Sequence, residues 1–158
     1  MATTAIRRAG FPSLLLFGGL VALTASAGLL YEPGAWYQHL AKPYWNPPSW
    51  VFGPVWGALY VGIAVAAWLV WRRSMRMVTS LHFWLAQLVF NWMWSYFFFG
   101  LQRPDLALVD IILLFIATVG FIVTARRRSI GASLLFVPYA GWVACATAFN
   151  FTIWQMNN

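Results

Sequence analysis

Two apolar segments of this chain carry amides and indoles at a spacing that would gather them on one side of a helix. In the first segment the pattern consists of Gln87, Asn91, Trp94, Ser95 and Phe98. In the second segment it consists of Tyr139, Trp142, Ala146, Phe149 and Asn150. Residues three or four positions apart share a helical face, so each set forms one stripe. Such stripes can bind a ligand through hydrogen bonds and ring stacking.

The amides and the indoles of these stripes support two different interpretations. An amide in an apolar medium turns inward to find a partner, because an unpaired polar group there is costly. Taken alone, the amides are best explained as hydrogen bonds between neighbouring helices. Trp94 and Trp142 lie too deep for the belt of indoles that marks a membrane surface. Together with Trp56 they predict an aromatic box in the interior.

Acid–base chemistry has few candidates in this sequence. The candidates are three acids, Glu32, Asp105 and Asp110, two histidines, His39 and His82, and the lone Cys145. No Ser-His-Asp set, paired carboxylate or H-E-x-x-H motif is present, and the histidines are expected about 30 Å apart across a membrane. We therefore predict no conventional hydrolase, no metal site and no resident cofactor.

Asp110 is the one acid expected inside an apolar segment. It lies six residues after Pro104, about 9 Å into a helix at 1.5 Å per residue. A carboxylate at such a depth usually faces the bundle or water. It either reaches the outer surface, where Arg103 would pair with it, or provides a polar group at the upper wall of a cavity.

A proline-rich stretch joins the first two apolar segments and reads K-P-Y-W-N-P-P-S-W-V-F-G-P-V-W from Lys42 to Trp56. Its prolines are Pro43, Pro47, Pro48 and Pro54. Proline fixes φ and removes a backbone donor, so we expect a short, structured and stiff loop. Such a loop is suited to form a lid or wall over a flat, apolar ligand.

The composition places these residues in a membrane protein. Of 158 residues, 62% are hydrophobic and 8% are charged, whereas soluble proteins carry about 25% charged residues. Five segments reach the roughly 20 apolar residues that cross a bilayer. They are Phe11–Leu30, Val51–Trp71, Leu81–Phe99, Leu106–Ala125 and Ile130–Trp154. We predict an all-α membrane protein, a bundle of five transmembrane helices in a single domain of residues 1–158.

The first span also resembles a secretory signal. Two arginines precede it, and Ala25-Ser26-Ala27 fits an A-x-A cleavage site. The apolar run nevertheless continues through Leu30 to full membrane length. We expect this helix to be retained.

The net charge of +7 is arranged as a topology signal. One set of loops and ends carries Arg7, Arg8, Arg72, Arg73, Arg76, Arg126, Arg127 and Arg128. The alternate loops carry only Lys42 and Arg103. The positive-inside rule then places the N-terminus in the cytoplasm and the C-terminus outside. Anionic lipid is the expected partner of the arginines, and nucleic acid is excluded because no soluble domain would present a basic face.

Three motifs resemble those of the translocator protein family, which includes the tryptophan-rich sensory proteins of bacteria and the peripheral benzodiazepine receptors of mitochondria. They are W-Y-x-x-L-x-K-P-x-W-x-P-P-x-W from Trp36, Q-L-x-x-N-x-x-W-S from Gln87, and V-P-Y-x-x-W-x-x-x-A-T-x-x-N from Val137. The resemblance covers nearly the whole chain and implies a bacterial member, in the inner membrane by its charge pattern. It also implies a commonly dimeric five-helix bundle.

The resemblance further implies a pocket near the first loop that binds porphyrins and, in animal members, sterols and drug ligands. Its residues here would be Tyr37, Pro47, Trp56, Asn91, Trp94, Ser95, Ile111, Trp142 and Ala146. The sterol-recognition pattern of Leu or Val, Tyr, then Lys or Arg does not occur at any Tyr of this chain, which argues against sterol transport.

Three functions follow from that resemblance and these residues. The first is a receptor-like protein that binds porphyrins of the protoporphyrin type and is linked to tetrapyrrole regulation or stress response. The second is a light-dependent enzyme in which Trp56 and Trp142 donate electrons to a photoexcited porphyrin and degrade it. The third is a carrier that moves porphyrin or lipid-like ligands between leaflets.

Overall fold

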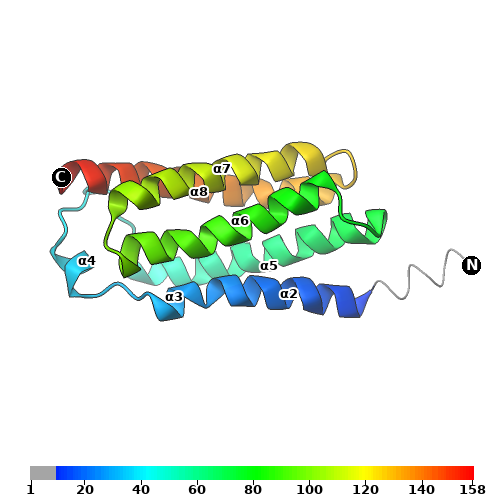
Figure 1. Cartoon of the computed structure of the whole chain (residues 1–158), viewed down its shortest axis with the longest axis horizontal. Helices are drawn as coiled ribbons and strands as arrows, with labels where there is room; N and C mark the ends of the chain where they lie inside the picture. Colours follow the sequence, from blue (N-terminus) through cyan, green and yellow to red (C-terminus); the bar gives the residue numbers. More distant parts are fainter. Residues whose placement is uncertain (1–9) are drawn as a thin grey trace, which may run out of the picture.

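The computed structural model describes residues 10–158, a range that contains helices and loops but no β-strand (Figure 1). The helices are α2 (Phe11–Ala25), α3 (Ala27–Leu30), α4 (Ala35–His39), α5 (Ser49–Ser74), α6 (Thr79–Ser95), the π-helix η1 (Tyr96–Gly100), α7 (Pro104–Ala125) and α8 (Ile130–Met156). Arg7 and Arg8, which contribute to the predicted topology, lie outside the described residues.

Four helical segments of the described chain are long and apolar enough to cross a membrane. They are Phe11–Leu30, Ser49–Ser74, Pro104–Ala125 and Ile130–Met156. The remaining predicted span corresponds to α6, which has 17 residues and continues directly into the five residues of η1. The prediction of an all-helical membrane protein is therefore confirmed.

The helix ends follow from residue types at each boundary. Pro104 occupies the first turn of α7, where its missing N–H would be unpaired in any case. The side chain of Ser129 caps α8 by accepting a hydrogen bond of 3.2 Å from the backbone N–H of Ala132. At the end of α5, Met75 takes a left-handed conformation with φ of 50°, which stops the helix.

The proline-rich loop is shorter than the sequence suggests. Helix α5 begins at Ser49, so Pro54 and Trp56 belong to the helix and not to the loop. Proline is tolerated here because only the bond to the carbonyl of Trp50 is lost, and Trp50 lies in the first turn. The loop that remains contains Pro43, Pro47 and Pro48, and the short helix α4 precedes it.

The long helices lie side by side along one axis, with α4 and the end of α8 together at one end of the bundle (Figure 1). Helix α7 packs chiefly against α6 and α8, and α5 packs against α2 and α8. Large side chains fill the space between them, and Trp84, Phe121, Phe136 and Tyr139 are fully buried. Leucines, valines and isoleucines cover the outside, as lipid contact requires.

Close contact between α6 and α7 depends on a glycine. A Cβ atom at Gly120 would lie 2.7 Å from both Cδ1 and Cε1 of Phe83. Such a distance forces the ring or the helices to move apart. Gly141 on α8, by contrast, has open space around the corresponding position.

We predict that Gly120→Ala destabilises the bundle by about 1–3 kcal/mol, because overpacking outweighs the gain in helix propensity. Gly141→Ala is the matched control and should be neutral or stabilising. Thermal unfolding in detergent, followed by circular dichroism, measures both. Adding Phe83→Leu should recover the stability lost by Gly120→Ala. A Gly120→Ala protein as stable as Gly141→Ala would contradict the close contact.

Candidate ligand-binding site

A chain of buried hydrogen bonds connects α5, α6 and α8. The hydroxyl of Tyr60 donates to Oδ1 of Asn91 at 3.2 Å, and Nδ2 of Asn91 donates to the hydroxyl of Tyr139 at 3.0 Å. The hydroxyl of Tyr139 in turn donates to Oε1 of Gln87 at 2.9 Å. Gln87 and Tyr139 are completely buried. The amides of α6 therefore join three helices, as the interpretation in terms of interhelical hydrogen bonds predicts.

A cluster of aromatic rings lies directly beside these hydrogen bonds. Trp56 stacks on Tyr60 with ring centroids 5.1 Å apart, and its edge contacts Tyr139 at 6.3 Å and Trp142 at 6.4 Å. Phe52 contacts Trp142 at 5.8 Å. Trp56 and Trp142 are each partly exposed, so part of each indole is free to contact a ligand. We call Trp56, Tyr60, Tyr139 and Trp142 the four-ring cluster.

A second aromatic group lies nearer the loop end of the bundle. Trp94 stacks on Phe98 with centroids 5.0 Å apart, and its Nε1 donates to Oδ1 of Asn150 at 2.9 Å. The Nδ2 of Asn150 donates to the carbonyl of Pro104 at 2.8 Å. Asn150 thereby connects α6, α7 and α8, and the Trp94 indole is held in one orientation.

Helix α4 places Tyr37 against this second group. The ring of Tyr37 contacts Phe98 at 6.2 Å and Phe99 at 5.5 Å. Burial raises the pKa of the Tyr37 phenol above its ordinary value, so this hydroxyl is neutral at physiological pH. The ammonium of Lys42 lies over the same ring, 4.6 Å from its centroid, and donates to two backbone carbonyls, those of Gln38 and Leu40.

The loop that carries Tyr37 is tied to the end of α8 by one side chain. Oδ1 of Asn157 accepts from the backbone N–H of Ala41 at 2.8 Å, and Nδ2 of Asn157 donates to the Ala41 carbonyl at 3.0 Å. The amide thus pairs with both backbone groups of Ala41. The same Nδ2 also donates to Ile153 in α8 at 2.8 Å.

The structure distributes the nine predicted ligand-binding residues over these groups. Trp56, Asn91 and Trp142 belong to the four-ring cluster and its hydrogen bonds, while Tyr37 and Trp94 both contact Phe98. The remaining four do not belong to either group. Ile111 is buried in the main core, Ala146 packs against that core, and Pro47 and Ser95 are half-buried in the loop and at the end of α6.

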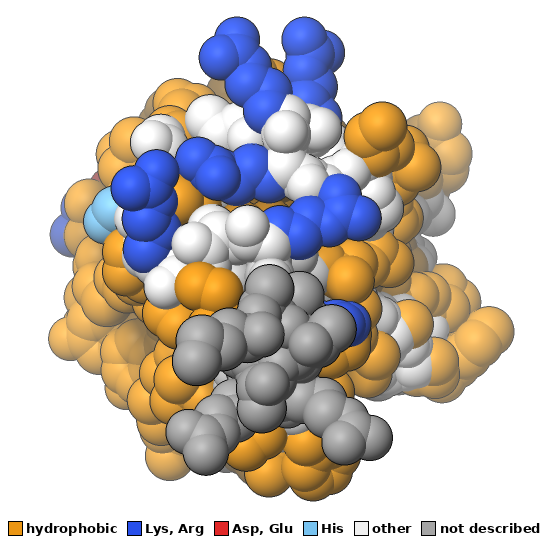
Figure 2. Space-filling model, turned by 90° about the vertical axis from the view of Figure 1, so that its right-hand side faces the viewer, with side chains coloured by type: hydrophobic (Ala, Val, Ile, Leu, Met, Phe, Trp, Pro, Cys, Tyr) orange, Lys and Arg blue, Asp and Glu red, His pale blue; other side chains and the backbone are white. Residues whose placement is uncertain are grey.

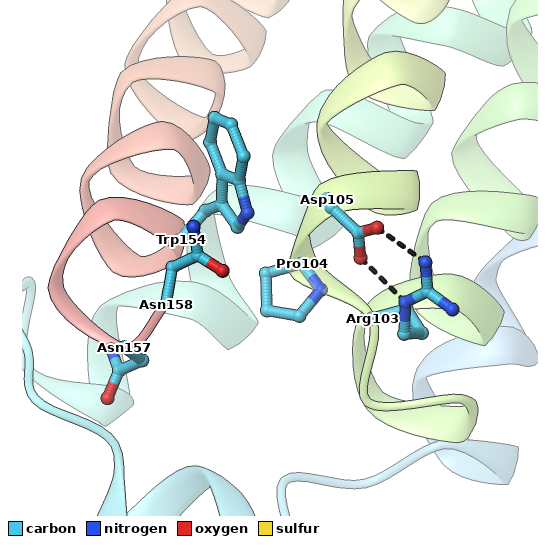
Figure 3. A pocket seen from close by; sticks show the side chains of 6 residues that line it. All are labelled: Arg103, Pro104, Asp105, Trp154, Asn157 and Asn158. Atoms are coloured by element: carbon cyan, nitrogen blue, oxygen red, sulfur yellow. Dashed lines mark hydrogen bonds and ion pairs between the residues drawn. The ribbon is translucent and has the colours of Figure 1, made fainter.

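Two hollows of the described chain lie away from these nine residues. One, of about 340 Å³, lies at the loop end and is lined by Arg103, Asp105, Trp154 and the last two asparagines (Figure 3). The other, of about 250 Å³, lies between α2, α5 and α6 and has an apolar lining. Neither hollow is lined by any of the nine predicted residues.

Of the two alternatives for Asp110, the one in which it pairs with Arg103 is wrong. Arg103 pairs with Asp105 through two bonds, Nε to Oδ1 at 2.8 Å and Nη2 to Oδ2 at 2.6 Å (Figure 3). This pairing raises the pKa of Arg103 further, so the guanidinium stays charged. The shorter separation in sequence decides the outcome, because Asp105 lies in the first turn of α7 and Asp110 lies more than a turn further on.

Asp110 also does not reach the outer surface. Its residue is 5% exposed, and its Oδ2 has no hydrogen-bond partner within residues 10–158. It lies on the buried face of α7 with Ala107, Ile111 and Leu114, because that face is turned toward the neighbouring helices. The alternative that Asp110 lines a cavity receives no support from the two hollows, whose linings do not include it.

Sequence reasoning missed Tyr60. Trp56 and Tyr60 are four residues apart, the spacing at which helical side chains meet, so this stacked pair could have been found from the sequence. The role of Asn157 carried no comparable signal, because Ala41 lies far away along the chain and offers only backbone groups.

Sequence comparison gives the same family as the motifs. The model of the TspO/MBR family matches residues 12–155 of this chain. The chain belongs to the TspO/MBR family. The predicted resemblance is thereby confirmed, and the apolar helices make this TspO/MBR protein an integral membrane protein.

Relatives of this TspO/MBR protein occur in bacteria and animals. It is 43% identical over 152 residues to the tryptophan-rich protein TspO of Chlorobaculum tepidum, covering 92% of this chain and 96% of the relative. It is 38% identical over 127 residues to the translocator protein of Homo sapiens, covering 78% and 75%. It is 35% identical over 139 residues to protein CrtK of Rhodobacter capsulatus, covering 86% and 87%.

We predict that Tyr139→Phe destabilises this TspO/MBR protein by about 1–2 kcal/mol, since it removes a partner from both Asn91 and Gln87. Tyr60→Phe is the control, because it removes only the longer bond to Oδ1 of Asn91. Equilibrium unfolding in mixed detergent measures both changes. Equal stability of the Tyr139→Phe and wild-type proteins would show that these buried bonds contribute nothing.

Proposed function

We propose that this protein binds porphyrins of the protoporphyrin type, or similar flat apolar molecules, on the four-ring cluster. The observation that carries the proposal is the contact between Trp56 and Trp142, two partly exposed indoles on different helices with centroids 6.4 Å apart. Aromatic rings stack favourably on flat π-systems. The protein's own hydrogen bonds hold the cluster in place, since Asn91 connects Tyr60 and Tyr139.

The carboxylates of a porphyrin would need a cation at the loop end of the bundle. Arg103 is already paired with Asp105, whereas within residues 10–158 Lys42 contacts only two backbone carbonyls and the Tyr37 ring. We therefore assign a propionate to Lys42. Tyr37, Pro47, Trp94 and Ser95 would line the path between Lys42 and the four-ring cluster, and Ile111 and Ala146 would form the apolar wall.

The physiological role that fits this binding is that of a receptor or sensor linked to tetrapyrrole regulation or stress. The curated relatives include a tryptophan-rich sensory protein of Cereibacter sphaeroides, 36% identical over 133 residues. A sensor needs a bound ligand and a rigid frame but no acid–base pair. This matches a described chain whose polar interior consists mainly of amides and hydroxyls.

We predict that protoporphyrin quenches the tryptophan fluorescence of the purified protein in a saturable manner in the dark. Trp142→Phe should weaken binding about two- to tenfold, because one aromatic contact contributes about 0.5–1.5 kcal/mol. Trp50→Phe is the matched control, since Trp50 is 75% exposed and lies in the first turn of α5, six residues before Trp56. Lys42→Gln should weaken the binding of protoporphyrin and leave the binding of its dimethyl ester, which lacks the free carboxylates, unchanged. Binding that is unsaturable, or equal in Trp142→Phe and Trp50→Phe, would contradict this site.

The same titration under light tests the alternative of a porphyrin-degrading enzyme. The proximity of Trp56 and Trp142 favours this alternative, because an indole can give one electron to a photoexcited porphyrin and recover it from its neighbour. Opening of the macrocycle would also need dissolved dioxygen. Loss of the porphyrin band only in light, and only with Trp142 present, would establish the enzyme. Movement of intact porphyrin across vesicles would instead establish the carrier.

We further propose five spans, with α6 and η1 forming the third, an inner-membrane location and a homodimer. The arginines that follow α5 and α7 would then face the cytoplasm, and Gln102 and the end of α8 would lie outside. Light scattering of the detergent-solubilised protein tests the dimer.

We predict that single cysteines introduced at two positions of a Cys145→Ala protein are labelled from opposite sides of the membrane. Gln102→Cys should react with an impermeant maleimide in intact spheroplasts, and Arg127→Cys only after permeabilisation. Both parent residues are exposed in loops, so accessibility within the protein does not limit the reaction. If both cysteines were labelled from the same side, the number of spans between them could not be odd, and the proposed topology would be excluded.

A further inference from the structure

The two ends of the bundle differ in the balance of their charges. Arginines of the α5–α6 and α7–α8 loops gather at one end, which faces the viewer in Figure 2. All three acids of the chain, Glu32, Asp105 and Asp110, lie in the half of the bundle near the other end. The ion pair of the described residues, Arg103 with Asp105, is also there. The negative charge that balances the basic end must therefore come from another molecule.

The arginines of this end differ in how the protein uses them. The guanidinium of Arg72 lies over the ring of Trp68, 4.6 Å from its centroid. Arg73 donates to the carbonyl of Arg128 at 2.5 Å. The side chain of Arg76 is exposed and makes no hydrogen bond, ion pair or ring contact within residues 10–158. Arg76 is thus the arginine of the α5–α6 loop that is free for an external anion.

An apolar hollow is lined in part by the residue that follows Arg76 in the chain. Its lining includes Met77, the next residue, and Trp71 from the end of α5. Its floor is formed by Phe17 and Trp84, whose rings meet edge to face with centroids 5.2 Å apart. Leu85 of α6 forms part of the wall and is 38% exposed. The hollow has a volume of about 250 Å³.

The walls of this hollow are fixed by contacts elsewhere. Nε1 of Trp68 donates to the carbonyl of Gly10 at 3.0 Å, which ties the start of α2 to α5. Nε1 of Trp84 donates to the carbonyl of Ile63 at 2.9 Å, which ties α6 to α5. The hollow therefore belongs to the packed frame of three helices.

We propose that this hollow binds an acyl chain of an anionic phospholipid whose headgroup phosphate contacts Arg76. The two halves of the site match the two halves of such a lipid. The lining is apolar along α2 and α6, and Arg76, which has no partner within residues 10–158, directly precedes the lining residue Met77 in the α5–α6 loop. A second copy of this chain fits less well, because its own basic end would bring further arginines against Arg76.

The test compares two lipids that share their acyl chains. Purified full-length protein is titrated in detergent with phosphatidylglycerol or phosphatidylcholine, and bound lipids are counted by native mass spectrometry. Phosphatidylglycerol should bind about fivefold more tightly, since an arginine near an anionic headgroup contributes roughly that factor. Arg76→Gln should abolish the difference. Arg127→Gln removes the same charge at the same end of the bundle but away from the hollow. It should preserve the difference between the two lipids.

The apolar half of the site has its own pair of variants. Leu85→Phe places a larger side chain at the hollow and should reduce binding of both lipids several-fold. Val89→Phe adds the same ring one turn along α6, outside the lining of the hollow, and should leave the binding of both lipids unchanged. Glycerol phosphate, which has a headgroup and no chain, should not compete.

Three outcomes would overturn the proposal. Equal effects of Arg76→Gln and Arg127→Gln would show a diffuse attraction to the basic end. Unchanged lipid binding in Leu85→Phe would show that the hollow is not occupied by the chain. A change in oligomeric mass in Leu85→Phe, with lipid counts unaltered, would show that a second copy covers this face.

Discussion

The structure depends on the need to pair the amides and hydroxyls that are buried between the helices, away from water. In a membrane no solvent is present to satisfy an amide or hydroxyl, so each must find a partner within the protein. Tyr139 meets this requirement for two residues at once, Asn91 and Gln87. Its hydroxyl thereby joins α6 to α8, and the bond from Tyr60 extends the connection to α5. These hydrogen bonds hold Tyr60 and Tyr139, two members of the four-ring cluster, in position.

The same constraint explains why ligand binding would use rings and not charges. A charged side chain inside the bundle costs several kcal/mol unless it is paired. The cations accordingly lie at the ends of the helices, as Lys42, Arg103 and the arginine loops do. An apolar ligand with a peripheral acid fits this division, with its flat part on the rings and its acid at a helix end. A phospholipid fits the basic end for the same reason.

Three expectations from the sequence differ from the structure, and only the last of them involves a partner that is distant along the chain. Pro54 was assigned to a stiff loop, yet α5 continues through it because only the hydrogen bond to the carbonyl of Trp50, in the first turn, is lost. Asp110 was directed toward Arg103, but Asp105 is nearer to that guanidinium. Asn157 was not expected to have a role, since its partner is the backbone of a distant loop.

The sequence by itself determined that this is an all-helical membrane protein of the TspO/MBR family, because hydropathy, the alternation of arginines and three motifs are local properties of the chain. It also identified which amides and indoles share a helical face, since a helix fixes that spacing. Only the tertiary structure decided which faces meet. The pairing of Asn91 with Tyr139, the contact of Trp56 with Trp142 and the burial of Asp110 depend on how the helices pack, and a helix can rotate about its axis without any change in its own pattern.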